Sequence, residues 1–231
     1  MAQKARAVVP HHALVSALSD EERINIIAEF KRKSPSRGEI SSGADPASMA
    51  RAYETAGAAA VSVLTEEDYF DGSLDDLRAV RQAISLPVLR KDFIFEEYQV
   101  YESAAAGADA LLLIVAALDD ETLTRLRLIT EDELGMDALI EVHTREEMDR
   151  AVKSGAKIIG VNNRNLSTFE VSLETSVQLI EVAPPDVILI SESGLGPDEA
   201  RNLRAAGYKA FLVGETLMRA DDPTVCLRGF L

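Results

Sequence analysis

The sequence predicts an α/β protein, a (β/α)8 TIM barrel with a short N-terminal extension. Short apolar segments without polar alternation occur eight times, as expected for strands buried on both faces of a parallel sheet. Amphipathic helical segments separate these strands, with no linker or low-complexity stretch between them. We therefore expect one domain over residues 1–231, in which residues 1–24 form the extension and residues 25–231 form the barrel.

Four glycines indicate an internal repeat. Gly57, Gly107, Gly155 and Gly207 each end a helical pattern and precede an aliphatic run, at intervals of about 50 residues. They therefore mark every second strand–helix unit. An open, doubly wound sheet is the alternative fold, but the Gly-rich dinucleotide fingerprint expected after its first strand is absent from this sequence.

The strands are expected, in order, at residues 25–30, 60–64, 86–91, 110–115, 137–142, 157–162, 187–191 and 210–213. The helices are expected at residues 46–56, 74–83, 96–106, 119–134, 144–154, 173–182, 197–206 and 222–229. Several helices have clear start signals, such as Asp45-Pro46, and Thr144 with Glu147 three residues later. Residues 13–18 and 20–23 are expected to form short helical pieces that cap the bottom of the barrel or border its mouth.

Composition excludes several classes of protein. The net charge of −15 argues against a nucleic-acid-binding protein, which needs a basic face. No apolar run approaches the roughly 18 residues that span a membrane, and we expect no signal peptide. The single Cys226 fits a reducing cytoplasm. No metal site is expected, because His11 and His12 are adjacent and His143 is isolated.

Charged side chains follow several of the expected strands, at the barrel end where active sites lie. Because side chains alternate along a strand, Glu29 and Lys31 lie on the face opposite to Phe30. Glu141 lies on the same face as Leu139. Charges that end strands one, three and five together are costly to desolvate without a function, so we favour a catalytic site over structural ion pairs.

The loop after the first strand and the ends of the last two strands indicate an anionic ligand. Residues 31–37 carry four positive charges and no negative one, although a solvated basic loop is the simpler alternative. Ser193-Gly194 and Gly214-Glu215 place backbone N–H groups where a phosphate binds in many such barrels. The alternative is that both glycines only form turns.

The segments that carry these residues together resemble the indole-3-glycerol phosphate synthase family of tryptophan biosynthesis. The similarity covers residues 24–222, and its segments are IIAEFKRKSPS (26–36), SVLTE (62–66), FDGS (70–73), LRKDFI (89–94), LIEV (139–142), GVNNRNL (160–166), SESG (191–194) and FLVGETLM (211–218). No single segment is decisive. Their occurrence in this order, at the spacing of barrel strands, is highly specific.

The resemblance implies a carboxy-lyase that converts 1-(2-carboxyphenylamino)-1-deoxyribulose 5-phosphate to indole-3-glycerol phosphate, CO2 and water without a cofactor. It implies that Lys91 is the general acid and that Glu141, with Glu29 close by, is the base. It also places Lys31 and Asn162 among the catalytic residues. The implied substrate-binding residues are Ser34, Arg164, Glu192, Ser193, Gly194, Gly214, Glu215, Phe70, Phe93 and Leu112. The partner implied is a small molecule with a carboxylate and a phosphate, and we expect a monomer or a weak homo-oligomer.

The sequence leaves the pKa of Lys91 undecided and departs from the family pattern at two places. Lys31 would lower the pKa of Lys91 and the carboxylates would raise it, so the direction of the shift is undecided. The family usually has a longer N-terminal segment that borders the site, and a shortened segment would affect substrate affinity more than chemistry. Arg37 stands where lysine is common, which keeps the charge.

Other functions remain possible on the same barrel. Lys91 could be the nucleophile of a Schiff-base phosphosugar aldolase. A phosphosugar isomerase would share the phosphate site but would need an acid/base pair in place of Lys31 and Lys91. A catalytically inactive binding scaffold is disfavoured, because every position implied by the resemblance is filled.

Overall fold

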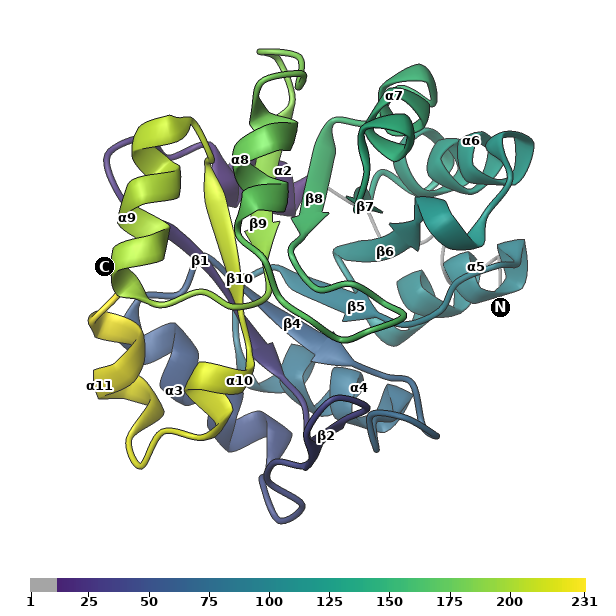
Figure 1. Ribbon diagram of the computed structural model, residues 1–231. Helices are drawn as coiled ribbons and strands as arrows, with labels where there is room; N and C mark the ends of the chain where they lie inside the picture. The colour runs from purple at the N-terminus through teal and green to yellow at the C-terminus, as the bar shows by residue number, and fades with distance from the viewer. Residues whose placement is uncertain (1–11) are drawn as a thin grey trace.

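The computed structural model describes residues 12–231 and contains a closed barrel of eight parallel strands (Figure 1). Around the barrel the strands follow the order β1, β10, β9, β8, β7, β6, β5 and β4. They span β1 Asn25–Phe30, β4 Ala60–Leu64, β5 Val88–Lys91, β6 Ala110–Ile114, β7 Asp137–Val142, β8 Ile158–Asn162, β9 Ile188–Glu192 and β10 Ala210–Val213. The predicted (β/α)8 fold is confirmed.

Helices lie on the outside of the barrel, where all but the last two connect successive strands and the last two follow β10 (Figure 1). They are α3 Pro46–Ala56, α4 Leu74–Ala83, α5 Glu97–Ala106, α6 Asp120–Leu128, α7 Arg145–Lys153, α8 Glu174–Ile180, α9 Pro197–Ala206, the short α10 Glu215–Met218 and α11 Pro223–Arg228. The four repeat glycines end α3, α5, α7 and α9 with positive φ angles, as the repeat predicts. In the described part of the chain, no helix has the length and apolar content needed to cross a bilayer.

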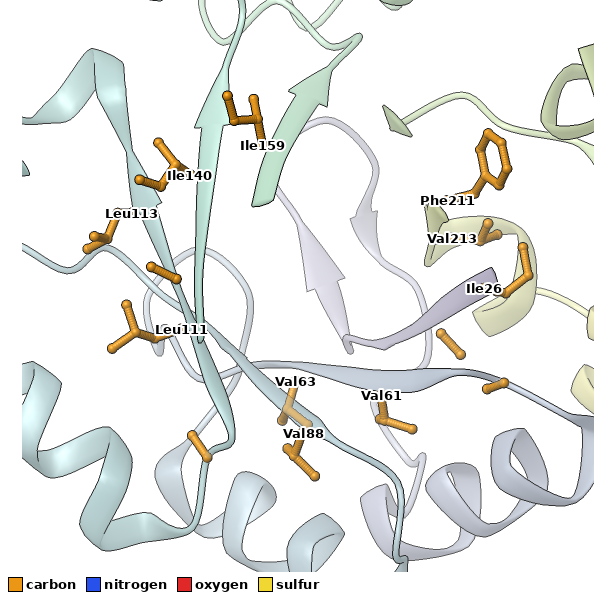
Figure 2. Packing of buried hydrophobic residues seen from close by; sticks show 14 of the residues in the cluster. Ile26, Val61, Val63, Val88, Leu111, Leu113, Ile140, Ile159, Phe211 and Val213 are labelled. Atoms are coloured by element: carbon orange, nitrogen blue, oxygen red, sulfur yellow. The ribbon is translucent and has the colours of Figure 1, made fainter. Parts of the chain in front are cut away.

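Strand parity divides the core into two clusters. Ile26, Ala28 and Phe30 of β1 face outward and pack with the helices, as do the outward residues of the other strands in Figure 2. Ile27 faces inward, where the apolar interior also contains Ala60, Leu89, Ala110, Leu112, Leu139, Ile158, Ile190, Ala210 and Leu212. Both faces of each strand are therefore buried, which explains why the strands read as continuous apolar runs.

Helix α2 (Ala13–Leu18) closes the bottom of the barrel, which was one of the two positions predicted for it. Its Leu14 and Leu18 are buried in the inner apolar cluster. The backbone N–H groups of Leu14 and Val15 donate to Oδ2 of the buried Asp137 at 2.9 and 3.0 Å. Asp137 at the start of β7 therefore caps a helix from a different part of the chain. Residues 1–11 of the expected extension lie outside the described residues.

The structure corrects three details of the element prediction. Residues 21–23 form bends, so the helical piece predicted at 20–23 is absent. The helix predicted at 119–134 ends as α6 at Leu128, and a π-helical turn, Ile129–Glu133, follows. This wide turn accompanies burial of Glu131, whose Oε2 accepts from Arg127 at 2.7 Å. The loop after β1 contains a small antiparallel hairpin, β2 Lys33–Ser34 with β3 Gly38–Glu39.

Candidate active site

Four charged side chains point into the barrel from every second strand, and we call them the ionic layer. They are Glu29 of β1, Lys91 of β5, Glu141 of β7 and Glu192 of β9. Two residues earlier, each of these strands carries an inward apolar side chain, namely Ile27, Leu89, Leu139 and Ile190. Alternate strands supply each layer of side chains in this type of barrel. The ionic layer therefore rests directly on the apolar interior.

Lys91 lies at the centre of the ionic layer. Its Nζ is 2.5 Å from Oε2 of Glu192, 3.7 Å from Oε2 of Glu29 and 3.7 Å from Oε2 of Glu141. Lys31 adds a second ammonium group, which donates to Oε1 of Glu29 at 2.6 Å. This contact confirms that Glu29 and Lys31 share a face. Glu29 therefore bridges the two lysines.

The structure resolves the direction of the Lys91 pKa shift. Burial favours the neutral amine, but the charges of Glu192, Glu29 and Glu141 outweigh burial and raise the pKa of Lys91. Burial also opposes the charge of Glu29, yet Lys31 and Lys91 hold the pKa of Glu29 below its ordinary value. Three carboxylates thus share two ammonium groups. Burial, together with the neighbouring carboxylates, raises the pKa of Glu192 to about 7 despite its contact with Lys91.

A cavity of about 890 Å³ opens above the ionic layer at the C-terminal ends of the strands. All but one of the site residues predicted from the sequence line it, and these are Glu29, Lys31, Ser34, Phe70, Lys91, Phe93, Leu112, Glu141, Asn162, Arg164, Ser193, Gly194, Gly214 and Glu215. Glu192 is the exception, because it is only 1% exposed and lies behind Lys91. The structure places it as a partner of Lys91.

One side of the cavity is apolar and aromatic. Leu112 and Ile114 of the β6 strand line it, together with Phe70 and Phe93, whose ring centroids are 6.5 Å apart. Leu166, Phe169 and Val171 of the loop after β8 also line it and were not predicted. Apolar residues in an otherwise polar loop were the available signal, but no periodicity distinguishes them from loop residues that face solvent.

The other side of the cavity is basic. Glu215 lies between three arginines, with Oε1 at 3.2 Å from Arg37 Nε and at 3.6 Å from Arg219, and Oε2 at 3.8 Å from Arg164. Arg219 was not predicted, since it lies beyond the last motif. The three arginines come from three separate connections of the barrel, so the side chain of Glu215 holds these connections near one another.

Polar contacts fix the loops that carry the basic side. Asn162 Oδ1 accepts from the backbone N–H of Arg164 at 3.0 Å and from Ser193 Oγ at 2.9 Å. The hairpin after β1 is held at its base by Arg32, whose guanidinium donates two hydrogen bonds of 2.7 Å to Asp76. Ser34 in this hairpin is buried at the cavity, and its hydroxyl has no hydrogen-bond partner among the described residues.

Gly214 is required by close approach. A Cβ at this position would lie 2.3 Å from Glu29 Oε1 and 3.0 Å from Lys31 Nζ. Only glycine therefore lets the end of β10 lie against the Glu29–Lys31 pair. Among residues 12–231, no three His, Cys, Asp or Glu side chains are grouped so that they could hold a metal ion.

Comparison with known proteins identifies the family. The family model described as indole-3-glycerol phosphate synthase matches residues 1–230. The indole-3-glycerol phosphate synthase of Mycobacterium avium is 52% identical over 220 residues, which cover 95% of this chain and 80% of that protein. The protein of the same name from Leifsonia xyli is 50% identical over 228 residues, which cover 98% of this chain and 86% of that protein.

Solved structures with low sequence identity share the fold. The 3-hexulose-6-phosphate synthase from Salmonella typhimurium has a TM-score of 0.72 at 10% identity, covering 90% of this chain and 96% of its own. The thiamine phosphate pyrophosphorylase from Pyrococcus furiosus has a TM-score of 0.65 at 17% identity, covering 91% and 94%. Sequence identity near 50% along almost the whole chain is far more specific. The chain therefore belongs to the indole-3-glycerol phosphate synthase family, a family of carboxy-lyases.

Proposed function

We propose that the chain converts 1-(2-carboxyphenylamino)-1-deoxyribulose 5-phosphate to indole-3-glycerol phosphate, CO2 and water, with Lys91 as the general acid. The observation that carries this proposal is the position of Lys91 at the cavity, surrounded by three carboxylates that raise its pKa. The raised pKa keeps Lys91 an ammonium ion, which is the form that donates a proton.

In the first step, the ring carbon that carries the carboxylate attacks the ribulose carbonyl carbon. The C=O π electrons move to oxygen, and Lys91 Nζ protonates this oxygen to give a hydroxyl group. The C–CO2 bond then breaks and CO2 leaves. The electron pair of the broken bond stays on the ring and restores its aromaticity. Glu192, at 2.5 Å from Nζ, is placed to return a proton to Lys91.

In the second step, the new five-membered ring loses water. Glu141, with Glu29 nearby, removes a proton from the carbon between the ring nitrogen and the carbon that carries the hydroxyl. The hydroxyl leaves as water with a proton from Lys91, which Glu192 has reprotonated after the first step, and the double bond of the indole forms. Both carboxylates line the cavity and contact Lys91 at 3.7 Å, so acid and base act on adjacent atoms.

The two sides of the cavity match the two ends of this substrate. The apolar side, which includes Leu112, Phe70 and Phe93, accommodates the aromatic ring. On the basic side, the phosphate contacts the backbone of Ser193, Gly194, Gly214 and Glu215. Lys31 and Arg164 bind the carboxylate or orient Lys91, while Asn162 and Ser34 position the reacting groups. The hairpin after β1 closes over the bound substrate.

The raised pKa of Lys91 also favours this function over the alternatives. A Schiff-base aldolase needs a neutral amine as its nucleophile, and three carboxylates oppose loss of the proton.

We propose that the enzyme acts in the cytoplasm without a cofactor, as a monomer or weak homo-oligomer that does not bind nucleic acid. Sedimentation velocity measures the oligomeric state directly.

The test is an assay for indole fluorescence after addition of the carboxyphenylamino substrate. Lys91→Ala is expected to lower kcat by about 10³-fold or more while substrate affinity changes little, because the acid is lost and the pocket is retained. Lys153→Ala, on the exposed face of α7, is the matched control and should behave as the parent does. Turnover of Lys91→Ala near the parent rate, or a borohydride-trapped adduct on Lys91, would overturn the assignment.

A further inference from the structure

His143 follows strand β7 and is anchored in the first turn of helix α7. Its ring Nδ1 is 3.3 Å from Oε2 of Glu147, and its backbone N–H donates to the same oxygen at 2.7 Å. Glu147 is itself held by Thr144, whose Oγ accepts from the Glu147 backbone N–H at 3.2 Å. The side chain of His143 is only 12% exposed. The imidazole is therefore fixed on its Nδ1 side.

The other ring nitrogen faces the ionic layer. His143 Nε2 is buried, has no hydrogen-bond partner within residues 12–231, and lies 3.6 Å from Oε1 of Glu141. The second oxygen of Glu141, Oε2, lies 3.7 Å from Lys91 Nζ. Glu141 is thus placed between the imidazole of His143 and the ammonium group of Lys91, with one carboxylate oxygen toward each.

The two carboxylates favour the imidazolium form of His143. Only this form carries a hydrogen on both ring nitrogens, so that both can be donated, one to Glu147 and one toward Glu141. The charged groups that act on the ring are Glu147 of α7, Glu141 of β7 and Glu192 of β9. Arg150 of α7 acts on Glu147, and Lys91 of β5 lies beyond Glu141. Burial opposes the charge, but the contact with Glu147 and the surrounding carboxylates outweigh it and raise the pKa of His143.

We propose that His143, as an imidazolium ion, is a positioning residue that holds Oε1 of Glu141 and thereby keeps Oε2 directed at Lys91 and the cavity. This inference rests on the proposed role of Glu141 as the base. His143 does not line the cavity itself, so it acts through Glu141 rather than on the substrate. The geometry links three groups in sequence, from Glu147 through His143 to Glu141.

A titration that needs no turnover tests the contact directly. In protein labelled with 15N histidine, the His143 signal is identified by its loss in His143→Gln, and its titration midpoint is expected above the ordinary 6.5. Glu147→Gln and Glu141→Gln should each lower that midpoint, because each removes a carboxylate that faces the ring. A midpoint at or below 6.5, or one that Glu141→Gln leaves unchanged, would overturn the inference.

Kinetics then test the effect on the base. His143→Gln is expected to lower kcat roughly 10-fold with little change in KM, a part of the 10²–10⁴-fold that a positioned base contributes. His143→Leu, which cannot donate, should lose more than His143→Gln. His12→Gln is the control, because His12 contacts Asp137 at the opposite end of the barrel.

The pH profile distinguishes positioning from a merely structural role. The imidazolium is present below the raised pKa of His143 and is lost as the pH increases through it, so kcat of the parent should fall there. Glu147→Gln should move this fall to lower pH, and His143→Gln should abolish it. A parent enzyme with no turnover would refute the proposed function, whereas active variants with the parent profile would refute only the role of His143.

Discussion

The ionic layer has more carboxylates than ammonium groups, and Glu192 is the residue at which this excess has its effect. It is one of three buried carboxylates that share two ammonium groups, and it lies deepest of the three, behind Lys91. Its Oε1 has no hydrogen-bond partner among the described residues. An ionised carboxylate in such a place is costly, which is why its pKa is raised to about 7. Glu192 therefore retains a proton in a pH range where an exposed glutamate is ionised.

This raised pKa predicts a pH-dependent stability effect of Glu192→Gln. Between the ordinary 4.5 and about 7, the folded protein holds a proton at Glu192 that the unfolded chain releases. The stability from this group is therefore fully present below pH 4.5 and is lost as the pH rises through 7. When the pH is raised from 5 to 8, the difference in free energy of unfolding between Glu192→Gln and the parent should shift in favour of the variant by about 1–3 kcal/mol. Urea denaturation at both pH values measures it, and an equal difference at both would contradict the prediction.

Gly214→Ala should disturb catalysis rather than folding. The added methyl group meets Glu29 Oε1 at 2.3 Å and must displace the Glu29–Lys31 pair. A displacement near 1 Å in an active site costs about 10²-fold, so we expect a loss of this order in kcat/KM. Steady-state kinetics and a thermal melt measure the two effects. Gly43→Ala, at a position where an added Cβ meets nothing within 4 Å, is the control and should leave both unchanged.

At the scale of elements, the two ends of the barrel use polar groups differently. At the mouth, charged residues from four strands meet around Lys91. At the bottom, Asp137 is the buried charge at the start of β7, and it faces the N-terminus of α2, where its carboxylate is favourable. The buried charge at the bottom of the barrel therefore holds a helix in place, whereas the charges at the mouth lie where we propose the chemistry.

Asp137→Asn should lower stability without affecting turnover, because Asp137 lies at the bottom of the barrel. The amide has one acceptor oxygen and no charge, whereas the carboxylate accepts from Leu14 N–H, Val15 N–H and His12. We expect a loss of about 1–3 kcal/mol in free energy of unfolding, the range for hydrogen bonds to a charged group, with kcat unchanged. Urea denaturation and turnover provide the readouts, with the exposed Asp186→Asn as control. A parallel loss of turnover and stability would contradict this expectation.

At the scale of the whole molecule, periodicity predicted most of the architecture. The eight apolar runs, the helix-ending glycines and strand parity predicted the closed barrel and brought Glu29, Lys31, Lys91 and Glu141 together. These are rules of local geometry, which a sequence displays directly. The π-helical turn at Ile129–Glu133 and the hairpin at Lys33–Glu39 instead accompany tertiary contacts, of Glu131 with Lys157 in the first case and of Arg32 with Asp76 in the second.

Only part of the site could be predicted from the sequence. Residues that follow strands were found because strand ends converge, whereas Arg219 and Phe169 reach the cavity through loops whose course no local pattern indicates. The position of Glu192 behind Lys91 could not be predicted, because it depends on how deeply each strand penetrates the layer. The direction of the Lys91 pKa shift was open for the same reason, since it depends on three distances that only the folded barrel defines.

The alternate-strand origin of the ionic layer has a consequence for how this sequence can change. Glu29, Lys91, Glu141 and Glu192 occupy positions that an apolar layer would otherwise fill, so each one is a neighbour of the others across the barrel axis. Replacing Lys91 alone leaves three buried carboxylates without the ammonium group that contacts all of them, and the cost of replacing a carboxylate then depends on whether Lys91 is present. Viable substitutions at these positions should therefore arise in compensating sets, and a combinatorial library that seeks new chemistry in this barrel should vary all four together.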